Sequence, residues 1–415
     1  MATTCSPTGD LVGRRLPEKF AALRRGPLPA STSGSEHRVT TFELFFDLAY
    51  VFAITQVSAL MASRHDALGV LQGLTVLALL WWSWTAYSWL SNHARADRGS
   101  VRVAMIVAMA AVFVAGLVLG ESFDPGRDRF PALVFVGAYL TARLAHLIVY
   151  LLASFEGERL RFRVAATGLS SLVPSVAMLL AGAVLGSPWQ LPLWIAAALY
   201  EPLAASFTGR DVDWRIHSVG HLVERHNLVI ILALGESVIA IGTGVSAEPT
   251  TPSILLGAVL AVLLCVAMWW VYFSRLAVDA EARLEHERGA ARARLATLAY
   301  TYLHLVLVAA IVLSAFGVEQ AMAHIDDPGS FGVFGASVLG FGLSSYLLGT
   351  ALFARVVLGR WDASRLVGAA LLVLSIPVLA LVPPWAALAV AGAALSIVLV
   401  GDARPWRSRS VEVVG

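Results

Sequence analysis

The sequence predicts an all-α protein, a polytopic bundle of about 12 transmembrane helices arranged as two six-helix halves. The prediction rests on an excess of apolar residues, on apolar segments of membrane-spanning length, and on motifs that recur in the two parts of the chain. Of 415 residues, 58% are hydrophobic and 14% are charged. Soluble domains carry about 45–50% apolar and about 25% charged residues. A water-soluble core cannot absorb that excess, so we expect a lipid bilayer around the protein.

The N-terminal segment, residues 1–37, is polar. It contains Pro, Ser, Gly and Arg but lacks the apolar stretch of a cleaved signal peptide. We therefore expect a flexible cytoplasmic tail, followed by a first helix that remains in the membrane as an uncleaved anchor. Cys5 and Cys265 are too few for a disulfide framework or a Cys-based metal site.

The spans follow from the length of each apolar segment, because a helix needs about 20 mostly apolar residues to cross a bilayer. Turn-forming motifs such as Asp124-Pro125-Gly126 and Pro383-Pro384 separate the segments. Residues 38–207 form the predicted first half, 208–401 the second half with its connecting loop, and 402–415 a cytoplasmic tail. The expected spans are 41–62, 68–90, 102–120, 131–153, 164–184, 189–207, 226–244, 253–275, 298–319, 332–354, 364–382 and 385–401.

The placement of basic residues supports this order of spans. Most of the 30 Lys and Arg residues fall in the two tails and in every second loop. The exceptions are Arg64, Arg127 and Arg129 in the other loops and Arg143 within a span. Cytoplasmic loops of membrane proteins carry such an excess of basic residues. Both termini are therefore predicted to lie in the cytoplasm.

Several motifs recur in the same order in the two parts of the chain. LLWWSWTAYSWL in the second span resembles AMWWVYFSRL in the eighth, and GSPWQLPLWIAAALY in the sixth resembles VPPWAALAVAGAALS in the twelfth. Aligning the first span with the seventh sets Asp47 against Asn227 and Gln56 against Glu236. Because each half has an even number of spans, both would share one orientation. A parallel repeat of this kind is found in transporters.

Two acids, Glu43 and Asp47, lie four residues apart in the otherwise apolar segment TFELFFDLAYVFAITQ and share one helix face. A charged side chain at the centre of a bilayer costs about 2.5–3.5 kcal/mol on insertion scales, and such residues mark ion or substrate pathways. Two structural alternatives remain open. Glu43 caps the helix start after Thr40, or Asp47 is neutralised by a buried Arg such as Arg143.

Glu236 is the deepest acid, well inside the seventh predicted span, where no Arg or Lys accompanies it. Gly235 beside it permits close approach of a neighbouring helix or a bound ion. A buried, unpaired carboxyl is suited to carry a proton, whereas an interhelical hydrogen bond is the structural alternative.

Further polar residues complete the predicted ion or substrate pathway. Arg143 is always charged and so needs an acid or an anionic ligand. His304 is either part of that pathway or a histidine satisfied within the core. Asp47 and Glu236 are expected to face a shared polar pocket. The deciding test is whether Asp47, Arg143 and Glu236 converge on one cavity between the halves, because a transport function loses its physical basis if they scatter to separate interfaces. The pathway set comprises Asp47, Glu236, Glu43, Arg143, Gln56, His304 and Glu319.

A candidate metal site precedes the seventh span. His217, His221 and Glu224 would share one face if the segment were helical, and these residue types ligate Zn²⁺ and similar ions. The alternative is a solvated amphipathic turn at the membrane interface.

Three stretches resemble the signature segments of the bacterial low temperature requirement A family of membrane proteins. They are HRVTTFELFFDLAYVFAITQVSAL, HLVERHNLVIILALGESVIAIG and YTYLHLVLVAAIVLSAFGVE. The resemblance covers nearly the whole chain past the N-terminal tail. It implies a polytopic protein of the inner membrane and carries no established molecular activity.

Intramembrane acids, Arg143 and the internal repeat favour a secondary transporter or channel for a small ion or solute. The alternatives are a membrane sensor or assembly protein for stress or low-temperature growth, and a membrane-embedded, metal-dependent enzyme. The sequence contains no P-loop and no Gly-rich nucleotide motif. No cofactor and no nucleic-acid partner are therefore expected, and the sequence leaves the oligomeric state open.

Reporter fusions test the predicted topology. Fusions after residues 60, 190 and 330 should report the outer side, and fusions after 160, 290 and 410 the cytoplasm, because the basic loops are retained inside. A single contrary result at one of the inner positions would break the count of twelve spans.

Overall fold

The computed structural model describes residues 38–93, 96, 99–124, 126, 128–153, 158–208, 216–244 and 249–403. Within these ranges every regular element is a helix. The predicted N-terminal tail and residues 404–415 of the predicted C-terminal tail lie outside the described residues. The all-α prediction is confirmed.

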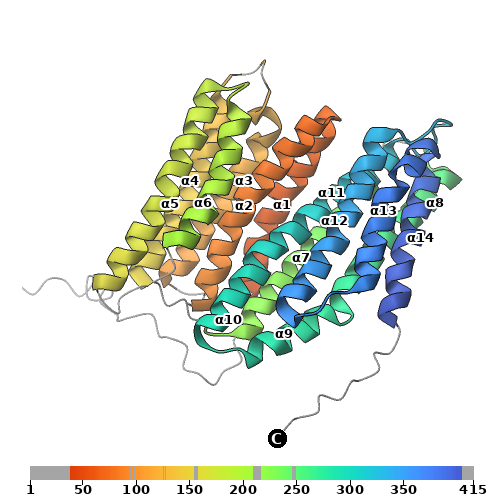
Figure 1. The fold of residues 1–415 in the computed structure, drawn as a ribbon. Coiled ribbons are helices and arrows are strands. Elements are labelled where there is room, and N and C mark those ends of the chain that lie inside the picture. The colour runs from red at the N-terminus through yellow and green to blue at the C-terminus, as the bar shows by residue number, and fades with distance from the viewer. Residues whose placement is uncertain are drawn as a thin grey trace, which may run out of the picture.

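The first six helices form one group, which lies to the left in Figure 1. The first helix begins after a capping box, in which the Thr40 hydroxyl accepts from the Glu43 amide and the Glu43 carboxylate accepts from the Thr40 amide. The bounds are α1 Thr41–Arg64, α2 Ala67–His93, α3 Gly99–Ser122, α4 Phe130–Ala153, α5 Glu158–Leu185 and α6 Gln190–Thr208.

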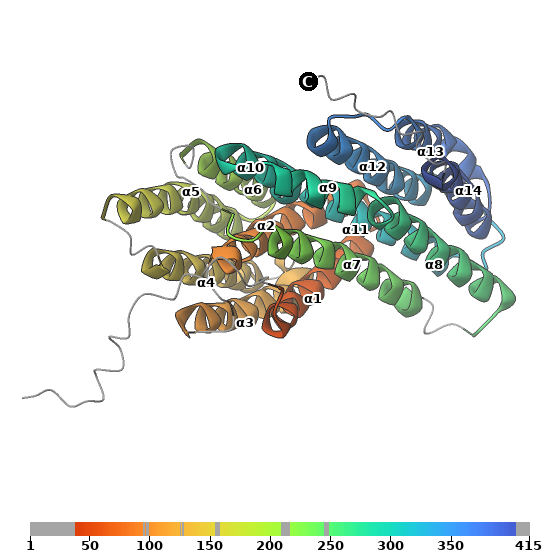
Figure 2. The same ribbon diagram turned by 90° about the horizontal axis from the view of Figure 1, so that it is seen from below.

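The remaining helices form a second group beside the first, and the short helices α9 and α10 lie across the end of the bundle where α7 begins (Figures 1 and 2). A π-helical segment, Thr297–Leu303, connects α10 to α11. The other bounds are α7 Val219–Gly244, α8 Pro252–Phe273, α9 Leu276–His286, α10 Gly289–Ala296, α11 His304–Ala323, α12 Val333–Leu358, α13 Ala363–Leu381 and α14 Pro384–Ala403.

Eleven helices in the described ranges are long and apolar enough to cross a membrane, with α8 running on into α9 and α10 into α11. The predicted span 189–207 is helical, as α6, but it is not among those eleven. Pro202 inside the helix and the polar Gln190 and Glu201 lower its hydropathy below that of the eleven. The twelve predicted spans therefore correspond to twelve helices, of which eleven meet the criterion for a membrane span.

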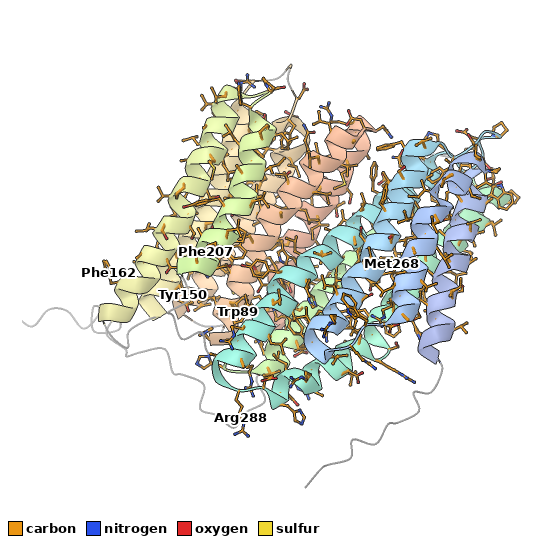
Figure 3. The ribbon with its side chains drawn as sticks, viewed as in Figure 1. Trp89, Tyr150, Phe162, Phe207, Met268 and Arg288 are labelled. Carbon is orange, nitrogen blue, oxygen red and sulfur yellow. The ribbon has the colours of Figure 1, made fainter. Side chains whose placement is uncertain are left out.

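The helices α1 and α2 of the first group contact α7 and α11 of the second. The π-helical segment also reaches the first group, since the Tyr302 hydroxyl donates to the Pro202 carbonyl of α6. The outer surface of the bundle is apolar. Figure 3 shows Phe162 and Phe207 pointing outward, and both are largely exposed, whereas Met268 lies inside the second group. Large exposed apolar residues cover most helices. Lipid chains are the environment that such a surface requires.

Glycines allow α11 and α12 to pack with their backbones in close contact. A Cβ atom on Gly342 would lie 2.6 Å from the Ser314 amide nitrogen, and one on Gly317 would lie 2.6 Å from the Leu339 Cα atom. Backbone atoms cannot move aside as a flexible side chain can. Small residues at such contacts are typical of helix packing in membranes.

Gly342→Ala should lower the free energy of unfolding in detergent by about 1–3 kcal/mol, because the added methyl overpacks the contact between α11 and α12. Gly137→Ala in α4 is the matched control, since nothing lies within 4 Å of a Cβ atom there. The control should be neutral or gain up to about 1 kcal/mol from helix propensity. Equal thermal stability of the two variants would contradict the close packing at Gly342.

Candidate functional site

Glu43 connects the beginnings of α1 and α7. One carboxylate oxygen accepts hydrogen bonds from the Thr40 amide at 2.8 Å and the Thr40 hydroxyl at 3.0 Å. The other lies 2.9 Å from Nε2 of His221 on α7. Both side chains are fully buried. Glu43 therefore has the capping role that the sequence left open, and it also has an interhelical partner.

Asp47 lies one turn further along α1 and pairs with Arg225, one turn further along α7. The Arg225 Nη2 atom donates to Asp47 Oδ1 at 2.9 Å, and the Trp84 indole N–H of α2 donates to the same oxygen at 2.8 Å. The Arg225 guanidinium also lies 5.5 Å from the centre of the Trp84 ring. Asp47 and Arg225 are both buried. We call Glu43, Asp47, His221 and Arg225 the ion-pair layer.

The ion-pair layer leaves polar atoms unsatisfied. Asp47 Oδ2 and the Nε and Nη1 atoms of Arg225 have no hydrogen-bond partner among the described residues. A guanidinium has five N–H donors, and orphaned buried donors are costly. Such a pair stabilises a fold poorly, because the desolvation of two charges opposes their attraction. The layer is therefore a place where water or a polar ligand can complete the hydrogen bonding.

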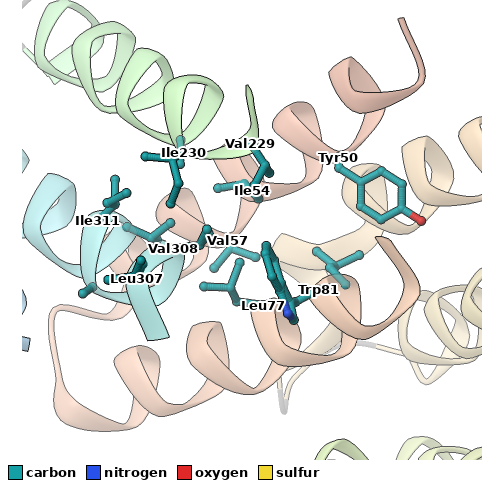
Figure 4. Close-up of a cluster of buried hydrophobic side chains, with 14 of the residues drawn as sticks. Tyr50, Ile54, Val57, Leu77, Trp81, Val229, Ile230, Leu307, Val308 and Ile311 are labelled. Carbon is teal, nitrogen blue, oxygen red and sulfur yellow. The ribbon is translucent and has the colours of Figure 1, made fainter. Parts of the chain in front are cut away.

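An apolar layer follows the ion-pair layer along the same helices. Figure 4 shows its side chains converging from α1, α2, α7 and α11. Each of its members is at most 7% exposed, so the layer is closed. The members of the apolar layer are Ile54, Val57, Leu77, Ile230, Leu307, Val308 and Ile311.

Glu236 lies beyond the apolar layer on α7, eleven residues after Arg225 and so about 16 Å further along the helix. Its side chain is buried, and neither carboxylate oxygen has a hydrogen-bond partner among the described residues. Ser58 of α1 lies beside it, and Glu319 of α11 is near enough to act on its charge. Ser58 is buried and Glu319 half-buried. We call Ser58, Glu236 and Glu319 the carboxyl layer.

His304 belongs to a buried cluster of aromatic and histidine side chains beside the ion-pair layer. Its Nε2 atom lies 2.8 Å from the Tyr272 hydroxyl, which donates to Asn227 at 3.0 Å, and its Nδ1 atom lies 2.9 Å from the Ala299 carbonyl. The ring of His226 is packed edge-on against His304 at 5.2 Å. Both ring nitrogens of His304 therefore have partners within the core, which was the alternative to a place in the ion or substrate pathway.

Arg143 is part of a separate ion pair within the first group of helices. Its Nε and Nη2 atoms donate to Glu201 Oε1 of α6 at 2.9 and 2.6 Å, and the Tyr139 hydroxyl donates to Glu201 Oε2 at 2.6 Å. A buried Arg does pair with Asp47, as one alternative proposed, but it is Arg225 and not Arg143. The acid that pairs with Arg143 is Glu201 of the predicted span 189–207, which was not among the predicted site residues.

Asp47, Arg143 and Glu236 do not converge on one cavity. Asp47 lies between α1 and α7, Arg143 pairs with Glu201 between α4 and α6, and the apolar layer separates Asp47 from Glu236. Gln56, on another side of α1, is half-buried and belongs to neither polar layer. The candidate site is therefore the contact between α1 and α7 with its two polar layers.

The predicted metal set does not assemble. Among the described residues, no group of three or more His, Cys, Asp or Glu side chains is placed to hold a metal ion. His217 precedes the first residue of α7, so the helical spacing does not apply to it, and its ring faces His93 at 4.8 Å. His221 pairs with Glu43, and Glu224 accepts from the Val39 amide at 3.1 Å.

Arg225 and Glu201 are the site residues that sequence reasoning missed. A signal for Arg225 exists in the sequence, because His221 and Arg225 repeat on α7 the four-residue spacing of Glu43 and Asp47 on α1. Two helices with matching acid and base spacings can pair at both positions in one register. Glu201 is the single acid of the span 189–207, and no spacing pattern connects it with Arg143.

Comparison with known proteins places the chain in a family. The family model of the bacterial low temperature requirement A protein matches residues 38–400. An uncharacterized protein of Rhizobium meliloti (strain 1021) is 27% identical over 376 residues, which cover 87% of this chain and 88% of that protein. No solved structure gives a significant match. The match to the family model spans nearly all of the described helices, and the chain belongs to the bacterial low temperature requirement A family.

Proposed function

We propose that this protein is a secondary transporter or channel for a small ion or solute, not an enzyme. The observation that carries the proposal is the arrangement at the contact of α1 and α7, where two buried polar layers lie on either side of a closed apolar layer. Charged residues inside a membrane are costly and are found along ion and substrate pathways. A barrier of buried apolar side chains between polar sites is what a gated pathway requires.

We also propose that the two halves are a parallel repeat. In the first group, α1 contacts α3, α3 contacts α4, α4 contacts α5 and α5 contacts α6. The same succession holds in the second group for α7, α11, α12, α13 and α14. One side-chain hydrogen bond also has a counterpart in the other half. Trp84 of α2 donates to Asp47 of α1, and Tyr272, its aligned counterpart on α8, donates to Asn227, the counterpart of Asp47.

The repeat and the ion-pair layer together give a mechanism of opening. The pairs Glu43–His221 and Asp47–Arg225 each connect one half to the other, so a rocking of the halves would separate or realign both pairs. The same rotation would part the apolar layer, because α1 contributes to it from one half and α7 and α11 from the other. Access would then alternate between the two polar layers while the protein stays in the inner membrane with both termini cytoplasmic.

A double-mutant cycle separates function from stability at the ion-pair layer. Asp47→Asn and Arg225→Gln should each destabilise the protein in detergent by about 3–5 kcal/mol, because each leaves one buried charge without its partner. The double variant should recover most of that loss, since no unpaired charge remains. Its transport should nevertheless stay abolished if these charges belong to the pathway.

Arg143 and Glu201 provide the matched control cycle, because they form a buried pair that does not bridge the halves. Arg143→Gln with Glu201→Gln should recover stability in the same way and keep transport. Loss of transport in both double variants, or in neither, would contradict the assignment of the pathway to the contact of α1 and α7.

Ion movement can be measured directly. Proteoliposomes on a solid-supported membrane should give a protein-dependent current on a rapid change of pH, NaCl or KCl. Glu236→Gln should reduce that current at least tenfold, whereas Glu287→Gln, at the surface pair with Arg283, should leave it unchanged. The absence of current for wild-type protein with all three probes would argue against the proposed function.

A further inference from the structure

Among the described residues, each buried carboxylate other than Glu236 has a basic partner. Asp47 is paired with Arg225, Glu201 with Arg143, and Glu43 with His221. Glu236 forms no ion pair with a described Arg, Lys or His, and the charge nearest to it is that of another acid, Glu319. An ionised Glu236 would therefore lack a described basic partner, which favours a positively charged ligand.

The carboxyl layer also contains an unsatisfied hydroxyl. Ser58 is 3% exposed and lies beside the Glu236 carboxyl. No hydrogen bond of normal length and angle joins its hydroxyl oxygen to a described residue. A buried hydroxyl and two buried carboxylate oxygens without partners form a set that an added proton could satisfy, since a protonated carboxyl both donates and accepts.

Too few oxygen atoms converge here for a hard metal ion. Ca²⁺ takes six to eight oxygen ligands and Mg²⁺ takes six. Among the described residues, the groups near enough to interact with Glu236 are the Ser58 hydroxyl from α1, the Cys265 thiol from α8 and the Glu319 carboxyl from α11. A proton needs one oxygen atom of one carboxylate, and the set fits that ligand.

A series of titratable groups leads from the surface to this carboxyl. His65, just after α1, is exposed, Glu319 is half-buried, and Glu236 is buried. His65 Nδ1 lies 3.0 Å from the side-chain oxygen of Gln320, the residue after Glu319, which holds the ring beside α11. Glu319 in turn acts on Glu236.

We propose that Glu236 is a proton-binding site, supplied from the membrane face where α1 ends through His65 and Glu319. The proton comes from water at that face, and it converts the Glu236 carboxylate to a neutral carboxylic acid with no other bond made or broken. In the neutral form Glu236 can donate to Ser58 and no longer repels Glu319. The proposal deepens the proposed function and rests on it, because it assigns the proton as the coupling or transported ion.

Infrared difference spectroscopy tests the binding step without requiring transport. Reconstituted protein stepped between acidic and alkaline buffer should show a protonated-carboxyl C=O band from a buried group, and Glu236→Gln should remove it. Glu236→Asp keeps a carboxyl and should shift the band, which guards against simple misfolding of the Gln variant. Glu121→Gln, at an exposed acid near the end of α3, is the matched control and should leave the band unchanged.

Proton flux, followed with pyranine trapped in proteoliposomes, tests the path. Glu236→Gln should abolish the flux, and Glu319→Gln and His65→Gln should slow it several-fold, whereas Glu121→Gln should not. If the band is lost in Glu236→Gln but wild-type protein moves no ion, the proton site stands and the transport function falls. An unchanged band in Glu236→Gln, together with a wild-type ion current that the Asp47→Asn and Arg225→Gln double variant abolishes, would overturn the proton site alone. Stabilisation of wild-type protein by Na⁺ or K⁺ at constant pH, absent in Glu236→Gln, would instead identify a metal cation as the ligand.

Discussion

The ion pair between Asp47 and Arg225 constrains the structure most strongly. Each group is buried in a membrane-spanning helix, so each depends on the other, and the two helices must be adjacent. The second pair, Glu43 with His221, has the same sequence separation of 178 residues and therefore fixes a single register of α1 against α7. That register places Ser58 and Glu236, each eleven residues further along, beside one another.

In the closed bundle, the apolar layer is a barrier between the ion-pair layer and the carboxyl layer. The apolar layer lies within the roughly 16 Å of helix between Arg225 and Glu236. Its side chains are packed from four helices, and an ion crossing it would lose its hydration without gaining ligands. Ions can therefore pass only if α1, α7 and α11 rearrange. The unsatisfied atoms of Asp47 and Arg225 lie before that barrier along α1 and α7, buried within the bundle.

Helix existence and order could be predicted from the sequence because they depend on local composition. A segment such as 253–275 is apolar throughout, and α8 lies within two residues of that range at each end. The one exception, α6, is the segment in which two prolines and two polar residues interrupt the apolar run. Capping by Glu43 after Thr40 was likewise predictable, because both partners lie within one turn.

The partners of the buried charges could not be read from composition. Arg143 and Asp47 are plausible partners in sequence, yet α4 and α6 are adjacent and bring Arg143 to Glu201. Which helices are neighbours is a property of packing between distant segments, and single residues do not encode it. The matched four-residue spacings on α1 and α7 were the one local sign of the observed pairing. For His217 a helical spacing was assumed, but this residue precedes the first residue of α7.

Movement at the contact of α1 and α7 is the central claim, and a cross-link tests it most directly. Ile54→Cys and Val229→Cys, in a background where Cys5 and Cys265 are replaced by Ser, place one thiol on each helix within or beside the apolar layer. A short thiol-specific cross-linker with a reducible bond would tie the helices together. Ion current in proteoliposomes should fall to background after cross-linking and return after reduction. Unchanged current through the cross-linked protein would contradict a pathway gated between these two helices.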